Sequence, residues 1–127
     1  MSKTSDVLNK IAEQIGDDYI TGTVFDPASG LGVVTRVGDP DFDTDTMNAY
    51  ISEYLKEVGK TFTNLKMPSR VVEYLVTANE EFTILIRGIT GTKYYQSCVV
   101  KKGGNLGLTK EILRKNEPSL IQELKKL

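Results

Sequence analysis

The sequence predicts an α+β fold, a five-stranded antiparallel sheet with helices on both faces, in the order α-β-β-α-β-β-β-α. Three observations predict it. Three stretches carry apolar residues at helical spacing, and five short stretches are rich in β-branched and aromatic types. The strands also follow one another through short turns, as neighbouring antiparallel strands do. At 127 residues, the chain is expected to form a single domain over residues 1–127.

The first helix and a hairpin are predicted at the start of the chain. Residues 5–16 place Val7, Leu8, Ile11, Ala12 and Ile15 on one helical stripe. Residues 19–25 and 31–37 are typical of strands, and the turn between them contains proline and glycine. We therefore expect these two strands to pair.

An acidic loop and a long helix follow. The alternating aspartates of residues 38–45 suggest a calcium loop, but neither register has the required glycine at position six and glutamate at position twelve. We expect no metal site here, and assign the loop to the positive end of the next helix, with Asp43, Asp45 or Thr46 as its cap. That helix is predicted over residues 46–65. Its apolar residues are Met47, Tyr50, Ile51, Tyr54, Leu55, Val58, Phe62 and Leu65.

Three strands and a last helix complete the chain. The strands are predicted over residues 70–78, 81–89 and 93–101, and two short turns join them into a meander. The last helix begins after residues 103–105. Pro118 lies inside it and predicts a kink or a restart.

Composition excludes several classes of function. The net charge is −1, so no general attraction to nucleic acid is expected. The chain has no histidine, which removes His-based catalysis and imidazole metal ligands. The lone cysteine, Cys98, fits a reducing compartment, and no apolar run is long enough for membrane insertion. We expect a cytoplasmic protein that is not an enzyme and holds no cofactor.

Charge is uneven along the chain. Residues 1–60 carry five basic and eleven acidic side chains, whereas residues 101–127 carry seven basic and three acidic ones. We interpret the basic end as the solvated face of the last helix. An acidic partner or a membrane surface is the alternative.

The strand over residues 70–78 predicts self-association. It is apolar on both faces and has no internal proline or lysine. If it lies at a sheet edge, its free N–H and C=O groups invite pairing, which a homodimer would satisfy. The second helix is expected to face its own sheet with Ile51, Tyr54, Val58 and Phe62. The predicted dimer contacts are Tyr50, Leu55, Leu65, Val72, Tyr74 and Val76.

The element order and two segments resemble the Roadblock family, which includes dynein light chains and MglB-like GTPase regulators. Gly104-Asn105-Leu106-Gly107-Leu108 is similar to the family's entry to its last helix, where Asn105 can act as a cap. Gly22–Asp26 with Gly30–Val34 is similar to its first hairpin. The resemblance covers about residues 5–125. The chain departs from it in a longer turn at 26–30 and in Pro118.

The resemblance implies a profilin-like sheet and a homodimer built on the second helix and third strand. It further implies binding and regulation of a Ras-like small GTPase. The expected partner contacts are Asn48, Ser52, Glu53 and Lys56. Two alternatives remain: a scaffold subunit of a larger motor-type or signalling complex without a GTPase, and a PAS- or profilin-like small-molecule sensor. A sensor should show a sizeable apolar cavity.

Overall fold

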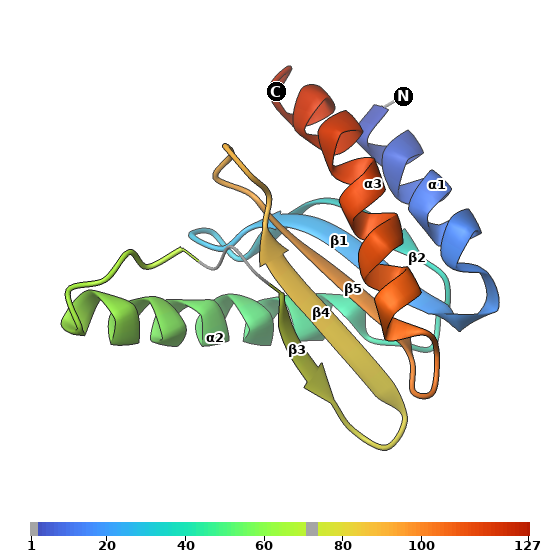
Figure 1. Cartoon of the computed structure of the whole chain (residues 1–127), viewed down its shortest axis with the longest axis horizontal. Coiled ribbons are helices and arrows are strands. Elements are labelled where there is room, and N and C mark those ends of the chain that lie inside the picture. The colour runs from blue at the N-terminus through green and yellow to red at the C-terminus, as the bar shows by residue number, and fades with distance from the viewer. Residues whose placement is uncertain (1–2, 71–73) are drawn as a thin grey trace.

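Five strands form one antiparallel sheet in the part of the chain that the structure, a computed structural model, describes: residues 3–70 and 74–127. The strand order is β2-β1-β5-β4-β3, so β2 and β3 are the two edges (Figure 1). In chain order the elements are α1 (Lys3–Ile15), η1 (Gly16–Asp18), β1 (Tyr19–Asp26), β2 (Leu31–Val37), α2 (Thr44–Asn64), β3 (Leu75–Ala78), β4 (Phe82–Gly88), β5 (Tyr95–Lys101) and α3 (Leu106–Leu124). The predicted fold class is confirmed.

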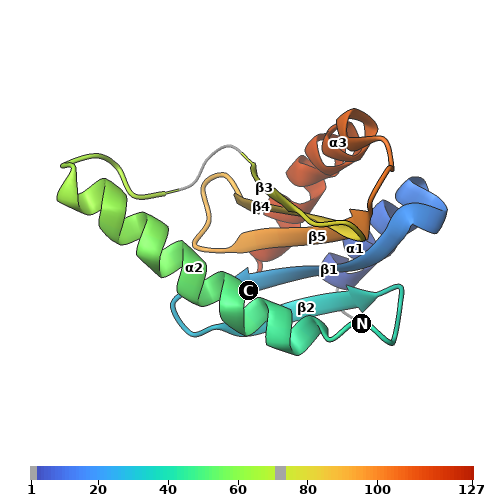
Figure 2. The ribbon, with the colours of Figure 1, turned by 90° about the horizontal axis from the view of Figure 1, so that it is seen from below.

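Helices cover both faces of the sheet. α1 and α3 pack together on one face, and α2 crosses the other (Figure 2). Alternation along the strands fills both layers: Val24 and Phe25 are fully buried, Val24 toward α1 and α3 and Phe25 toward α2. Leu85 and Ile86 of β4 divide in the same way. None of the described helices is long and apolar enough to cross a bilayer.

α3 is one continuous helix through Pro118, so the predicted restart does not occur. The proline removes one backbone hydrogen bond, but packing on either side of it holds the helix in place. Leu120 has no exposed surface. Glu117 accepts a hydrogen bond from the Thr90 N–H at 3.1 Å and forms an ion pair with Arg87 of β4. These contacts fix the last helix to the sheet.

β3 (Leu75–Ala78) lies within the strand predicted over residues 70–78, of which residues 71–73 lie outside the described residues. It begins at Leu75, opposite Ile86, and β4 continues for only two residues beyond that pair. In this register, residue 70 would have no partner within β4. Instead, the Arg70 guanidinium donates to two carbonyls that flank the β4–β5 turn, at 2.8 and 3.1 Å.

Candidate functional site

β3 leaves a row of backbone groups free at one edge of the sheet. The Asn79 N–H donates to the Phe82 carbonyl at 2.9 Å, which makes these residues a hydrogen-bonded pair. Because such pairs alternate in an antiparallel ladder, Thr77 turns its backbone groups toward β4, whereas Val76 and Ala78 turn theirs outward. No described strand lies on that outer side. The third strand is an edge, which is the condition on which the predicted self-association depends.

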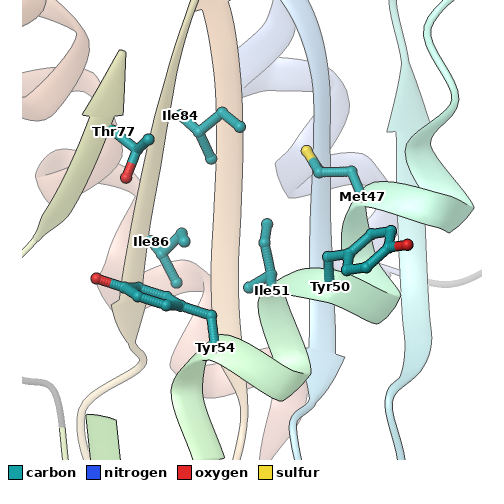
Figure 3. A pocket seen from close by; sticks show the side chains of 7 residues that line it. All are labelled: Met47, Tyr50, Ile51, Tyr54, Thr77, Ile84 and Ile86. Carbon is teal, nitrogen blue, oxygen red and sulfur yellow. The ribbon is translucent and has the colours of Figure 1, made fainter. Parts of the chain in front are cut away.

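An apolar groove of about 320 Å³ lies between α2 and the β3–β4 hairpin. Figure 3 shows Tyr54 reaching toward Ile86 of β4, with Ile51 between helix and strands. The lining residues are Met47, Tyr50, Ile51, Tyr54, Thr77, Ile84 and Ile86. Tyr50 is 74% exposed and Tyr54 48%. The single chain therefore leaves two aromatic rings of α2 partly in water, of which Tyr54 points toward β3 and β4 (Figure 3).

The end of α2 extends this apolar surface. The helix runs out past the β3 edge of the sheet (Figure 1), and Leu65 and Met67 at its end are 63% and 51% exposed. Exposed apolar groups that gather in one region mark interaction sites. We call Tyr50, Tyr54, Leu65 and Met67, which border the free backbone edge of β3, the α2–β3 surface.

The predicted dimer residues divide between exposed and buried positions. Those that are exposed, as expected, are Tyr50, Leu65 and Val76. Leu55 is 7% exposed and packs with Phe25 and Ile86, so the prediction that it is free to meet a partner helix is wrong. It follows the buried Ile51 by four residues and shares its line on the helix. Tyr54, expected to face the sheet, points toward Ile86 of β4 but keeps 48% of its surface exposed.

Of the remaining two predicted dimer residues, the structure describes one. Tyr74 is half-buried on the opposite face of the sheet, where the Arg87 guanidinium carbon is 4.9 Å from its ring centroid. Its side chain is therefore not part of the α2–β3 surface. Val72 lies outside the described residues.

The four predicted partner contacts also divide. Asn48 and Ser52 are 4% and 2% exposed, so the expectation that they lie open to a partner is wrong. They face the sheet, where the Asn48 amide donates to Thr23 Oγ1 at 3.2 Å. Glu53 and Lys56 are on the solvent side of α2 and form an ion pair at 3.4 Å.

The titratable groups with perturbed pKa values have structural roles. The Asp43 carboxylate caps α2 by accepting from Thr46 N at 3.1 Å and Thr46 Oγ1 at 2.6 Å, and these bonds lower its pKa. Burial raises the pKa of the Cys98 thiol to about 12, so it is protonated and unreactive near neutral pH. No group of three or more metal-ligating side chains gathers within the described residues.

A five-stranded sheet with α2 on one face and α1 and α3 on the other is the fold of Roadblock/LC7 domains. MglB from Myxococcus xanthus superposes with a TM-score of 0.83 at 11% identity, over 100% of this chain and 98% of that one. MglB from Thermus thermophilus gives 0.78 at 12% identity, over 100% and 95%. A Roadblock/LC7 domain from Streptomyces avermitilis gives 0.74 at 13%, over 95% and 97%.

The sequence itself matches no protein-family model and no curated protein. Identities this low show a shared fold. They confirm the resemblance to the Roadblock family at that level.

Proposed function

We propose that this chain is a homodimeric interaction module that binds and regulates a Ras-like small GTPase in the cytoplasm, and that it is not itself an enzyme. The observation that carries the proposal is the free edge of β3 near the exposed apolar side of α2, where Tyr54 points toward β3 and β4. An open edge and a neighbouring apolar face are costly in a monomer, and one symmetric contact removes both costs.

The arrangement of the edge and the helix supports the proposed dimer. Antiparallel pairing of β3 with its copy joins two sheets into one of ten strands and is self-complementary about a twofold axis. Because α2 runs out past the β3 edge, the end of α2 in one protomer would lie over the sheet of the other. That position would cover Leu65 and Met67, which the single chain leaves exposed.

The GTPase partner rests on the resemblance to Roadblock proteins and on the outer face of α2. Two ion pairs lie along that face, Glu53–Lys56 at 3.4 Å and Glu57–Lys60 at 3.1 Å. In a dimer the two helices would present a mixed-charge platform on one side of the joined sheet. Charged rims of this kind set orientation and association rate more than affinity.

The position of the apolar groove favours a platform over a sensor. Small-molecule sites enclose most of their ligand, whereas this groove is bordered by exposed tyrosines beside a sheet edge. A partner's surface or a second protomer fits such a groove better than an enclosed small ligand. The scaffold alternative differs only in the partner, so the next experiment separates the two.

The test is capture of a GTPase from native lysate on the immobilised protein, once with GTPγS and once with GDP, followed by mass spectrometry. We expect a Ras-like GTPase to be enriched in one nucleotide state and lost with the double charge reversal Glu53→Lys/Lys56→Glu. The matched control is Glu111→Lys/Arg114→Glu, an ion pair of the same spacing on α3, across the sheet. Absence of any GTPase in both states would contradict the proposal and favour the scaffold.

A further inference from the structure

β2, the second edge of the sheet, also turns backbone groups outward. The Gly38 N–H donates to the Ile20 carbonyl at 2.7 Å, so Gly38 and Ile20 form a hydrogen-bonded pair. Residues of β2 then alternate between pairing with β1 and turning their backbone groups outward. Arg36 therefore pairs with β1, while Thr35 and Val37 turn their backbone groups away from it. The Arg36 guanidinium donates a hydrogen bond to the Val37 carbonyl. This contact agrees with a Val37 carbonyl that points away from β1. The Arg36 side chain thus occupies one of the outward backbone acceptors of β2, the Val37 carbonyl.

A groove of about 610 Å³ runs beside the same two residues. The side chains of Thr35 and Val37 form one wall, and the loop that leads into α2 forms the other. Phe42 lies in that loop and is held by an edge-to-face contact with Phe82, with ring centroids 5.2 Å apart. The outward backbone groups and the groove are therefore next to one another, and the loop wall is anchored to the sheet.

The groove is negatively charged. Asp41, Asp43 and Asp45 line it, and no lysine or arginine does. Asp43 is committed to capping α2, but Asp41 and Asp45 form no ion pair with any residue that the structure describes. Both are exposed. Two carboxylates thus lie without an ion-pair partner among the described residues beside a free strand edge.

We propose that the β2 edge binds an extended, lysine- or arginine-rich segment of a partner protein by strand addition. The segment's backbone pairs with the outward groups of Thr35 and Val37 and displaces the Arg36 guanidinium from the Val37 carbonyl. Side chains alternate along a strand, so every second one enters the groove, where a cationic head reaches Asp41 or Asp45. Backbone bonds supply the docking, and the carboxylates select a basic sequence.

A second copy of this chain is a poor occupant of the β2 edge. Two copies would bring the same aspartates together, and like charges close in space are destabilising. The register also shifts between Val24 and Phe25, where Val33 is the extra residue of β2, and such a bulge bends the strand. The straight edge is therefore short, and the complex should be weak and sensitive to salt.

The test uses a fluorescein-labelled peptide of alternating valine and lysine, six residues long, with binding followed by fluorescence anisotropy. We expect saturable binding that falls as salt rises. An acidic peptide of alternating valine and glutamate should not bind. Methylating the alternate backbone amides of the basic peptide should abolish binding, because it removes the donors that pair with β2.

Protein variants then separate charge from edge pairing. Asp41→Asn/Asp45→Asn should weaken binding about tenfold, the effect of two exposed ion pairs. Glu53→Gln/Glu57→Gln makes the same change in net charge on the outer face of α2 and should leave binding unchanged.

Two changes on β2 itself test the strand edge. Val37→Pro removes an outward donor and should abolish binding, while Arg36→Gln uncovers the Val37 carbonyl and should tighten it. The proposal is overturned if the Asp41/Asp45 and Glu53/Glu57 double variants lose peptide affinity equally, or if the methylated peptide binds as tightly as the unmethylated one. Either result would mean that charge attraction alone explains the binding. None of these outcomes depends on the dimer, which uses the other edge.

Discussion

Replacing Val76 by proline tests the dimer at a single backbone group. Val76 and Ala78 of each protomer offer one outward N–H each, so full pairing of β3 with its copy makes four cross-chain hydrogen bonds. Proline at position 76 removes one donor per protomer, hence two of the four. The β3–β4 ladder keeps its bonds, because those come from Leu75 and Thr77. Proline is also apolar, so little apolar contact is lost.

The expected loss follows from the value of one such bond. At about 0.5–1.5 kcal/mol net for each hydrogen bond, two bonds contribute about 1–3 kcal/mol. That weakens the dimer by roughly 5- to 150-fold in Kd. Light scattering over a dilution series should give twice the 14.1 kDa chain mass for the native protein, and a shift toward 14.1 kDa at higher concentration for Val76→Pro.

Val37→Pro is the matched control. Val37 lies on the other edge strand, also turns its N–H outward, and is 41% exposed, against 40% for Val76. It should leave the dimer intact. Thermal melts of both variants check that the fold survives. If Val76→Pro dimerises as tightly as the native chain, or if Val37→Pro dissociates it instead, β3 is not the dimer strand.

Four further results are expected. Asn105→Ala removes the acceptor for the Leu108 N–H at 2.9 Å and should cost about 1 kcal/mol in urea unfolding. Asp43→Ala should lower the melting temperature at pH 7. The pKa of Asp43 in the folded state lies below its ordinary 3.8, so the stabilisation by its carboxylate is complete above pH 3.8. The difference in melting temperature between the native protein and the variant should vanish as the pH falls through the folded pKa. Cys98, 1% exposed, should react with a thiol reagent at pH 8 only after denaturant is added. Calorimetry should detect no calcium binding at a Kd of ~10⁻⁵ M or tighter, because the loop 38–45 lacks the glycine and glutamate of a calcium loop.

The order and type of the elements could be predicted because local signals agree with the global fold. The strand predicted over residues 31–37 matches β2, where a turn with Gly30 at φ 74° sets its start. The helix predicted over 46–65 is found at 44–64, capped by Asp43. Capping and turn chemistry act within a few residues, so a single sequence reveals them.

The face that α2 presents to the sheet could not be predicted from apolar spacing. Thr44, Asn48 and Ser52 recur every four residues and pack on the sheet, where the Thr44 hydroxyl donates to Thr21 Oγ1 at 3.0 Å. A search for apolar stripes assigns such residues to solvent. The sequence feature that points to a polar helix face is the pair Thr21 and Thr23 in β1, which are buried and supply polar partners for α2. Recognising it requires knowing that α2 crosses β1, which is a tertiary fact.

The two edges of the sheet explain why one surface suits self-association and the other does not. β3 has four residues, none of them charged or proline, and the exposed apolar side of α2 lies beside it. β2 carries the bulge at Val33, the Arg36 guanidinium over an edge carbonyl, and the aspartates that line the adjacent groove. These are the devices by which proteins keep an edge from pairing with its own copy. The protection of β2 and the open edge of β3 together support the two proposals: that a second copy pairs at β3, and that β2 takes a partner of opposite charge.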